Sequence, residues 1–377
     1  MLLTDLEARN FRNLRGKTSC GIGLNILLGD NGQGKTSWLE SIYLLATTKS
    51  FRTAKLSEAI AFDEASALVV GRIRVSDEIE HELRALLEGN AKAFSVNGKR
   101  ETIQRYLGEL HAVVFNADEL EVVRGTPEIR RRFLDDSIVA IHPPYIQTIS
   151  DLGRILKQKN TLLQNSRDRE LSFAQISESL APWNDQLAAV AAKVHRSRVR
   201  IVERLNEALA KGLFGEEQIS IRYVSSLEDK GDLSDYEALI SERLTLRVQA
   251  EVAAGHSLIG PQRDELEILL NGRDLRKFGS SGQQRSALLM LQLANIEIFY
   301  EQRGEYPLFL LDDIDAELDY RRIGQLLEYL SGRTQTFVTT SKESFADEFG
   351  LLATVIRVEK GRIAEVRTPS EAWSASG

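Results

Sequence analysis

The 377-residue sequence has a single cysteine, Cys20, which excludes an internal disulfide framework and suits a reducing compartment. Long hydrophobic runs are also missing. Unbroken apolar stretches are short, as at residues 187–192, whereas a membrane-spanning helix needs about 20 such residues. Asp5 and Glu7 interrupt the leucines near the start, so this segment is no secretory signal peptide. We therefore expect a cytoplasmic protein that makes no contact with a membrane.

The sequence has no excess of positive charge either. Its 48 Lys+Arg stand against 55 Asp+Glu, a net charge of −7, which argues against a nucleic-acid-binding protein. Net charge says little about local patches, however, and basic residues cluster in three places. The first cluster is the triplet Arg130, Arg131 and Arg132, and the second is a run that includes Arg196, Arg198 and Arg200. The third, near the predicted junction of arm and head, is Arg263, Arg273, Arg276 and Lys277.

The first two clusters lie in segments with helical spacing, so a solvated helix face explains them as well as a binding surface does. Few aromatic residues are interleaved, which argues against base stacking as the main contact. If these residues bind DNA, double- or single-stranded, we expect contacts to the phosphate backbone that do not depend on sequence.

Hydrophobic periodicity divides the chain into three parts. Alternation predicts strands at residues 2–9, 67–75 and 79–87, and Asn-Gly turns at 97–98 and 271–272 predict hairpins. From about 127 to 254 the spacing is helical instead. One apolar stripe there passes through Leu187, Val190, Val194, Ile201, Leu205 and Leu209. We predict an α/β head in two segments, 1–123 and 255–377, with an inserted helical arm at 124–254. A helical subdomain with no special role is the alternative.

The most specific motif follows a short apolar strand predicted at residues 24–28. It matches the pattern G-x-x-x-x-G-K-[ST] with Gly29, Asp30, Asn31, Gly32, Gln33, Gly34, Lys35 and Thr36. Glycines let successive backbone N–H groups point at one phosphate, and the start of the helix predicted at 36–45 adds positive potential. Lys35 would reach the β- and γ-phosphates, and the Thr36 hydroxyl would bind Mg²⁺. A chance match is the competing explanation, but the strand–loop–helix context favours a nucleotide site.

Two carboxylates supply a second element of such a site. The mostly apolar run at 307–311 ends in Asp312 and Asp313, as a buried strand with acids at its C-terminal edge would. Asp312 would hold Mg²⁺ and Asp313 would act as a general base toward the attacking water. An ordinary strand followed by a solvated acidic turn would give the same pattern. The phosphate loop upstream favours the functional interpretation.

A second glycine motif, Ser280-Ser281-Gly282-Gln283, precedes an apolar helix predicted at 287–299. The N-terminus of a helix binds anions through its free N–H groups and its dipole. Because the chain has one phosphate loop, a second such helix start makes sense if it serves a nucleotide held by another copy of the chain. A plain N-capped helix is the competing explanation.

In this order along the chain, the motifs resemble the ABC-type ATPase head and, within it, the SMC-like RecF family of DNA replication and repair proteins. The resemblance extends from Leu6 to about Thr340. It also rests on residues 11–13 (Phe-Arg-Asn), 130–134 (Arg-Arg-Arg-Phe-Leu) and 260–264 (Gly-Pro-Gln-Arg-Asp). The resemblance implies an ATPase head that binds ATP and Mg²⁺, forms an ATP-dependent homodimer, binds DNA and acts with RecO and RecR.

The family pattern also implies roles for individual residues. It makes residues 29–36 the Walker A loop and Asp312 and Asp313 the Walker B acids. Ser280, Gly282 and Gln283 correspond to the signature motif, and Asp319 corresponds to the D-loop acid. Arg12 and Asn13 fall where SMC-like heads contact the nucleotide.

Three positions depart from the general ABC pattern. The second Walker B acid is Asp313 rather than Glu, Thr339 and Thr340 stand where most ABC proteins have a switch histidine, and no Q-loop glutamine is evident near 116–119. The first two changes predict slow hydrolysis, and hence a weak, DNA-stimulated ATPase that works as a switch. The alternatives are another SMC-like or ABC ATPase head, a transporter subunit, a P-loop kinase, or a scaffold in which ATP only holds the fold.

Overall fold

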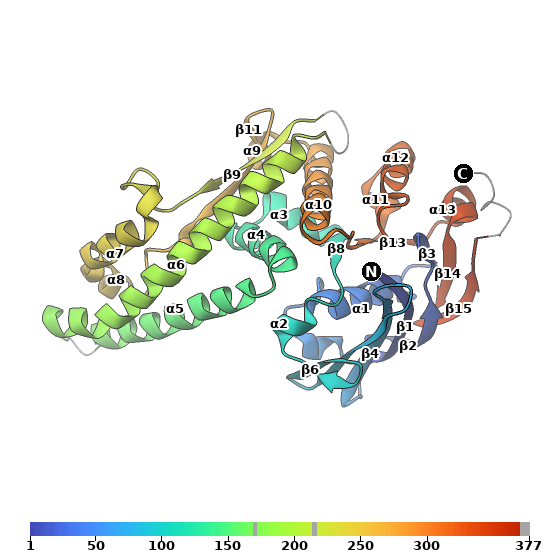
Figure 1. Cartoon of the computed structure of the whole chain (residues 1–377), viewed down its shortest axis with the longest axis horizontal. Coiled ribbons are helices and arrows are strands. Elements are labelled where there is room, and N and C mark those ends of the chain that lie inside the picture. The colour runs from blue at the N-terminus through green and yellow to red at the C-terminus, as the bar shows by residue number, and fades with distance from the viewer. Residues whose placement is uncertain (169–171, 213–216, 370–377) are drawn as a thin grey trace. The chain divides into compact units, whose positions relative to one another are not determined.

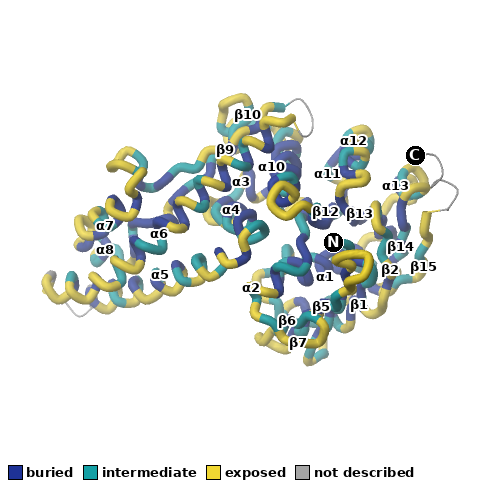
Figure 2. Tube along the Cα trace, in the orientation of Figure 1, coloured by how far each residue is buried: buried dark blue, intermediate teal, exposed yellow. Residues whose placement is uncertain are grey.

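The computed structural model describes residues 1–168, 172–212 and 217–369, which pack into two units. The first unit combines Met1–Leu120 with the C-terminal part of the chain from Leu288, and the second is Glu121–Ala287 (Figure 1). Each unit has its own buried segments (Figure 2). The predicted fold class, an α/β head interrupted by an insertion with long helices, is confirmed.

One sheet of the first unit is antiparallel. Its strand order is β2-β1-β4-β5-β6-β7. The strands are β1 (Leu2–Phe11), β2 (Leu14–Ser19), β4 (Ser66–Arg74), β5 (Glu80–Glu88), β6 (Ala91–Val96) and β7 (Lys99–Arg100). The predicted hairpin at Asn97 and Gly98 joins β6 to β7, and both residues have positive φ, 50° and 76°, as such a turn requires. The three strands predicted by alternation are therefore confirmed.

The other sheet of the first unit is mainly parallel, with strand order β15-β14-β3-β13-β12-β8. The strands are β3 (Leu24–Leu28), β8 (Ala112–Phe115), β12 (Leu308–Leu311), β13 (Thr336–Thr340), β14 (Thr354–Glu359) and β15 (Arg362–Arg367). Only β15 runs antiparallel to its neighbour. Because β3, β13 and β12 are adjacent and parallel, their C-terminal ends meet at one edge of the sheet. Loops at this edge carry the motifs found in the sequence.

Helix α1 (Lys35–Thr47) follows β3 and packs against strands of both sheets. Trp38, Ile42 and Leu45, which are spaced four and three residues apart within the predicted helix 36–45, are buried there. The other helical elements of this unit are η1 (Leu56–Ala59), α2 (Ile103–Tyr106), η2 (Asp118–Leu120), α11 (Ile314–Glu317), α12 (Tyr320–Leu330), α13 (Glu343–Phe349) and η5 (Gly350–Leu352). Helix α10 (Ser281–Arg303) begins in the second unit and ends in the first.

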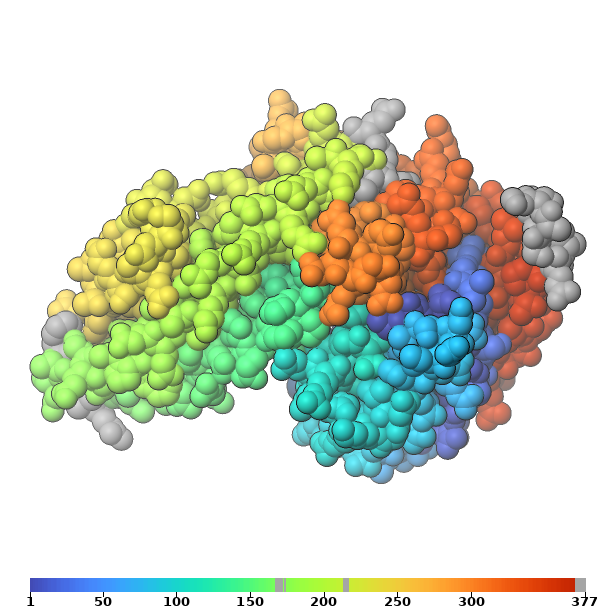
Figure 3. Space-filling model, viewed as in Figure 1, coloured from blue at the N-terminus to red at the C-terminus, as the bar shows by residue number. Residues whose placement is uncertain are grey.

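The second unit is built on two long helices, α5 (Tyr145–Asp168) and α6 (Phe173–Leu209), which lie side by side (Figure 3). A capping box between Ser172 and Gln175 begins α6. The remaining elements are α3 (Glu121–Arg124), α4 (Pro127–Ile141), β9 (Ile219–Val224), η3 (Leu233–Asp235), α7 (Tyr236–Leu246), α8 (Val248–Ala254), η4 (Pro261–Arg263), β10 (Glu265–Leu270), β11 (Arg273–Asp274) and α9 (Leu275–Phe278).

Strand β9 lies within residues 127–254, where the sequence indicated mainly helices and no strand was predicted. Ile219, Ile221 and Tyr223 alternate with polar residues, and β9 pairs antiparallel with β10. The predicted turn at Asn271 and Gly272 joins β10 to β11 and completes a three-stranded sheet. This pairing draws residues 255–287, which the sequence analysis assigns to the head, into the second unit.

In residues 1–168, 172–212 and 217–369, no helix combines the length and apolar character needed to cross a lipid bilayer.

Candidate nucleotide-binding site

The phosphate-loop motif forms the turn between β3 and α1. Gly32 and Gly34 have φ of 80° and 103°, a left-handed backbone conformation that residues with side chains rarely adopt. A Cβ atom at Gly34 would lie 3.0 Å from the side-chain amide of Asn13, and one at Gly29 would lie 2.4 Å from the carbonyl oxygen of Val358. The glycines are thus required by backbone conformation and by close packing.

Lys35 is the first residue of α1 and is buried. Its Nζ donates hydrogen bonds to the carbonyl oxygens of Gly29 at 2.8 Å and Asp30 at 3.0 Å. An ammonium group with three donors can hold the loop in this way and still direct a donor and its charge toward a phosphate. The turn joining β14 to β15 supports the loop from outside, because Gly361 N donates to the carbonyl oxygen of Gln33 at 2.7 Å.

Asp312 follows β12 and faces the hydroxyl group of Thr36. Thr36 Oγ1 donates to Asp312 Oδ1 at 2.9 Å, and Thr339 Oγ1 at the end of β13 donates to the same oxygen at 2.7 Å. Burial raises the pKa of Asp312 above its ordinary value, while the hydrogen bond from Thr339 opposes this shift. The site therefore holds a carboxylate that lacks full solvation beside a threonine hydroxyl.

Asp313 is exposed at the mouth of the site and has φ of 47°. Its backbone N–H donates to Thr339 Oγ1 at 2.8 Å, so one threonine positions both consecutive aspartates. Desolvation raises the pKa of Asp313, against the opposing effect of the positive charge of Lys35. A raised pKa makes a carboxylate a better proton acceptor.

The role of Thr339 was missed by the sequence analysis, which noted only that Thr339 and Thr340 occupy the position of a switch histidine. The available signal was a run of two threonines at the end of an apolar strand. Threonine side chains are polar, and both are fully buried here, so each needs a hydrogen-bond partner. Asn116, in the region where a Q-loop glutamine was sought, follows β8 and accepts a hydrogen bond from Glu119 N at 2.8 Å.

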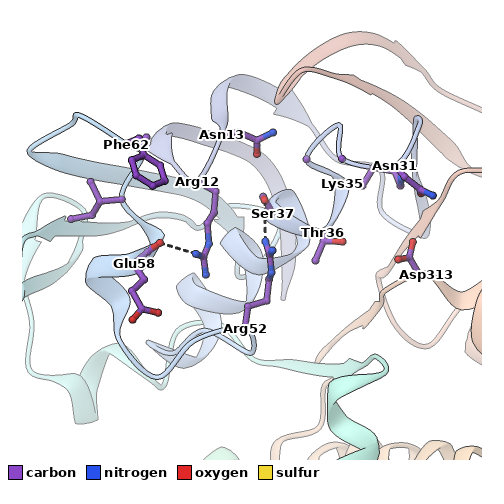
Figure 4. Close-up of a pocket in the computed structure, with 14 residues that line it drawn as sticks. Arg12, Asn13, Asn31, Lys35, Thr36, Ser37, Arg52, Glu58, Phe62 and Asp313 are labelled. Carbon is purple, nitrogen blue, oxygen red and sulfur yellow. Dashed lines mark hydrogen bonds between the residues drawn. The ribbon is translucent and has the colours of Figure 1, made fainter.

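A cavity of about 750 Å³ opens beside the phosphate loop (Figure 4). This volume falls within the range of about 300–1,000 Å³ that is typical of small-molecule sites. The lining residues are Arg12, Asn13, Asn31, Gly32, Gly34, Lys35, Thr36, Ser37, Arg52, Glu58, Ile60, Ala61, Phe62 and Asp313. Of the predicted site residues, the structure thus brings Arg12, Asn13, Asp313 and five residues of the phosphate loop (31, 32, 34, 35 and 36) to one cavity. The lining residues Ser37, Arg52, Glu58, Ile60, Ala61 and Phe62 were not predicted.

Arg12 is held rigidly in the wall of this cavity. Its guanidinium donates to both carboxylate oxygens of Glu40, at 3.0 and 2.8 Å, and to the carbonyl oxygen of Glu58 at 2.7 Å. Glu40 is fully buried on α1, so this bidentate pair neutralises a charge that would otherwise be costly to bury. The hydrogen bond from Arg12 to the carbonyl oxygen of Glu58 ties the end of β1 to the segment around Glu58 (Figure 4).

The oxygen atoms of Thr36 and Asp312 suit a hard divalent cation. Mg²⁺ is usually bound by one or two carboxylates together with the phosphates of a substrate. In the part of the chain that the structure describes, no group of three or more His, Cys, Asp or Glu could hold a metal ion. The donor set therefore fits a Mg²⁺ ion shared with a nucleotide and does not form an all-protein metal cage.

Ser280, Gly282 and Gln283, the predicted signature residues, belong to the second unit. Ser280 precedes α10 and forms a capping box with Gln283, because Gln283 N donates to Ser280 Oγ at 3.3 Å and Ser280 N donates to Gln283 Oε1 at 2.9 Å. Gly282 is exposed, and a Cβ there would meet only Ser280 Oγ at 4.0 Å. Asp319, the predicted D-loop acid, caps α12 by accepting from Arg322 N.

The basic clusters divide into buried and exposed residues, which corrects part of the predicted DNA surface. Arg130 forms a bidentate pair with Glu265, and Arg198 forms one with Asp135; both arginines are 3% exposed. Because their guanidinium groups are buried and bound to these carboxylates, neither arginine belongs to the predicted DNA-binding surface. Arg131 donates to the carbonyl oxygen of Asp264. The exposed arginines of the first two clusters are Arg132, Arg196 and Arg200.

The fold and the site define a P-loop ATPase head of the ABC and SMC type. The family model described as RecF/RecN/SMC N terminal domain matches residues 2–364. A DNA replication and repair protein RecF from Shouchella clausii (strain KSM-K16) is 35% identical over 377 residues, covering 96% of this chain and 99% of the relative. One from Gloeobacter violaceus (strain ATCC 29082 / PCC 7421) is 37% identical over 380 residues, covering 98% and 100%. The chain therefore belongs to the RecF/RecN/SMC family and, within it, to the RecF proteins of DNA replication and repair.

Solved structures agree with this assignment. A structure described as the recombination mediator RecF-ATP in the RecFOR pathway has a TM-score of 0.87 and 29% identity, covering 97% of this chain and 98% of that one. The corresponding RecF-ATPrS structure has a TM-score of 0.86, also at 29% identity, covering 96% and 97%. An SMC head bound to the C-terminal winged-helix domain of ScpA has a TM-score of 0.52 at 15% identity, covering 98% and 99%, and shares the fold alone.

Proposed function

We propose that the chain binds ATP together with Mg²⁺ and hydrolyses it slowly as a switch for DNA binding. The observation that carries the proposal is the shared contact of Thr36 and Thr339 with one oxygen of Asp312, where Thr36 also lines a cavity together with Lys35 and other residues of the phosphate loop. In this proposal the N–H groups of residues 29–36 and Lys35 bind the phosphates, and Thr36 and Asp312 hold Mg²⁺. The ion would neutralise charge on the phosphate oxygens.

Asp313 would act as the general base by accepting a proton from the attacking water at its carboxylate. Its side chain is one methylene shorter than glutamate, and Thr339 is not an imidazole, so we expect slow turnover. Asp313→Asn should abolish hydrolysis and retain ATP binding, as measured by single-turnover assay and calorimetry. Hydrolysis as fast as that of a typical transporter ATPase in the unaltered protein would contradict the proposal of a slow switch.

ATP binding is tested by calorimetry on the unaltered protein and on Lys35→Arg. The ammonium group of lysine is compact and donates to the two loop carbonyls, whereas the guanidinium group of arginine is larger and planar. The Lys35→Arg variant should therefore bind Mg-ATP far more weakly. Lys17→Arg is the matched control, because Lys17 is exposed on β2 and pairs with Asp5 away from the cavity. Equal affinities for ATP in all three proteins would refute the assignment of Lys35.

We further propose that ATP joins two copies of the chain. The exposed start of α10 would present the backbone N–H groups of Ser281 and Gly282 to a partner's phosphate, and among the described residues a Cβ at Gly282 would meet only Ser280 Oγ, at 4.0 Å. Light scattering should show the mass doubling with ATP. Ser280→Arg should bind ATP and stay monomeric, whereas Ser76→Arg, on an exposed loop of the first unit, should dimerise normally. A P-loop kinase would show no change in mass.

DNA binding would use the exposed arginines Arg132, Arg196 and Arg200 and would be independent of sequence. Log affinity should fall steeply with log salt, and each Arg→Ala change should reduce that slope by about one. Arg105→Ala is the control, because Arg105 is exposed on the first unit. A strong preference for one DNA sequence would contradict backbone recognition.

The resemblance to RecF also implies RecO and RecR as partners and a cytoplasmic location, which we retain as part of the proposal. The RecFOR pathway named for the solved RecF structures supports this choice of partners. Mixing the chain with RecR, RecO and gapped DNA, with and without ATP, should yield ATP-dependent co-elution. Elution of each protein alone under all conditions would reject these partners.

A further inference from the structure

Phe62 stands out among the residues that line the cavity. It is 99% exposed, and it is the one large aromatic side chain in a lining that otherwise consists of polar, charged, glycine and small apolar residues. Single exposed apolar residues are common on protein surfaces and need no explanation by themselves. Phe62 differs because it lies in the wall of the proposed ATP site.

The backbone around Phe62 is fixed, so its exposure is not that of a loose loop. Arg12 N donates to the carbonyl oxygen of Ala59 at 2.6 Å, and Ala61 N donates to that of Asn10 at 2.8 Å. These bonds flank a bridge between Phe11 and Ile60. The segment is therefore hydrogen-bonded to the end of β1 in the manner of an extra strand.

A tight turn then presents the ring. Glu64 N donates to the carbonyl oxygen of Ala61 at 3.2 Å, which places Phe62 and Asp63 at the two central positions of a β-turn. Asp63 has φ of 62°, as one of the central residues of several turn types requires. Because the segment is already ordered, a ligand that contacts Phe62 loses less entropy on binding than it would with a mobile loop.

The two sides of the cavity differ in chemistry. Lys35, Thr36 and Asp313 form a side suited to phosphates and a cation, whereas Ile60, Ala61 and Phe62 form an apolar one beside the fixed guanidinium of Arg12. Figure 4 shows Phe62 next to Arg12 and on the side away from Asp313. A nucleoside triphosphate has the same polarity, with charge at one end and a flat aromatic base at the other.

We propose that Phe62 stacks on the base of the bound nucleotide and makes the site favour purine triphosphates. This inference rests on the proposed function, because it assumes that the phosphate loop takes the triphosphate. Stacking depends on the area of the base and not on its hydrogen-bonding groups. It therefore distinguishes the larger purines from pyrimidines better than it distinguishes ATP from GTP. Phe62 is thus a positioning residue for the base and takes no part in hydrolysis.

The test compares ligands that have and lack a base. Phe62→Ala should weaken Mg-ATP binding about tenfold, within the effect of losing one base–aromatic stack, and should leave the affinity for Mg-tripolyphosphate unchanged. Its preference for ATP over CTP should also narrow. Phe62→Trp should keep the ATP affinity, with indole emission quenched by ATP and not by tripolyphosphate. Leu351→Ala is the control, because Leu351 is 76% exposed in the same unit and does not line the cavity.

All measurements are repeated in the Ser280→Arg background, so that dimerisation cannot alter the apparent affinity. The inference is overturned if Phe62→Ala binds ATP normally, if it loses ATP and tripolyphosphate by the same factor, or if its defect disappears in the Ser280→Arg background. A wild-type protein that binds neither ATP nor tripolyphosphate would refute the proposed function itself. Normal binding of ATP by the wild-type protein and by Phe62→Ala would refute only the role of Phe62.

Discussion

Thr339→Val tests the hydrogen-bond network that positions the two aspartates. Valine has almost the same shape as threonine, so the substitution leaves packing in β13 intact and removes one hydroxyl group. That hydroxyl donates to Asp312 Oδ1 at 2.7 Å and accepts from Asp313 N at 2.8 Å. Both bonds disappear together, and Thr36 remains as the side-chain donor to Asp312.

The expected loss of stability follows from these two bonds. A hydrogen bond to an ionised group contributes about 1.5–3 kcal/mol, and a donor left without a partner costs about 1–3 kcal/mol. We expect the lower end of the sum, about 2.5 kcal/mol, because Asp313 is exposed and water can reach its amide. For a domain of 150–250 residues this corresponds to a fall in Tm of about 5–10 °C.

The pH dependence identifies the carboxylate as the cause. Burial raises the folded pKa of Asp312 above its ordinary value of 3.8, so this group lowers stability as pH rises from 3.8 through the folded pKa. Thr339→Val removes a bond that favours the ionised form and raises this pKa further. The variant should therefore lose most stability at neutral pH, and the loss should shrink at acidic pH, where Asp312 is protonated.

Thr340→Val is the matched control, because Thr340 is equally buried on β13. Its hydroxyl accepts a hydrogen bond from Lys342 N at 3.1 Å, so the bond that this variant loses involves neither aspartate. The free energy of unfolding of Thr340→Val should fall by about 1 kcal/mol, and this loss should be the same whether Asp312 is protonated or ionised. Thermal unfolding of both variants between pH 4 and pH 8 provides the comparison. Equal losses in the two variants, or a loss for Thr339→Val that does not change with pH, would refute the reasoning.

Two further predictions concern the loop and the buried arginines. Gly34→Ala should lower stability by at least about 1 kcal/mol and abolish ATP binding, because φ at this position is 103°. Gly324→Ala in α12 should be neutral or stabilising, and equal calorimetric results for the two variants would contradict this difference. Arg198→Met should cost about 3–5 kcal/mol because it leaves the carboxylate of Asp135 unpaired. Arg196→Met should leave Tm unchanged and weaken DNA binding, and the reverse pattern would contradict the division into buried and exposed residues.

The contiguous motifs could be predicted from the sequence because their geometry is local. Residues 29–36 contain the whole phosphate loop, and the strand before it and the helix after it have clear periodicity. Asp312 could be placed because an apolar strand ends there, and parallel strands bring their C-terminal ends to one edge. The position of Thr339 beside Asp312 required knowledge of strand order, which periodicity does not contain.

Residues 58–62 could not be assigned to the site for a related reason. Their contact with β1 is an isolated bridge, which leaves no alternation in the sequence. The cavity wall containing Phe62 therefore depends on tertiary hydrogen bonds to Asn10 and Arg12, and these link segments about fifty residues apart along the chain. Strand β9 is a different case, because its alternation was present and was outweighed by the helical segments on either side.

The buried arginines explain how a count of basic residues can mislead. In a helix, positions three and four residues apart share a face, so Arg198 lies on the same side as Val194 and Ile201. The apolar stripe of α6 has a gap of seven residues between those two, and Arg198 fills it. An arginine at a stripe position must be neutralised within the protein, and Asp135 does this. Arg196 and Arg200 are four residues apart on the opposite face and remain exposed. Periodicity therefore separates structural from surface arginines within a single basic run, and the net charge of −7 has no bearing on which of them can reach DNA.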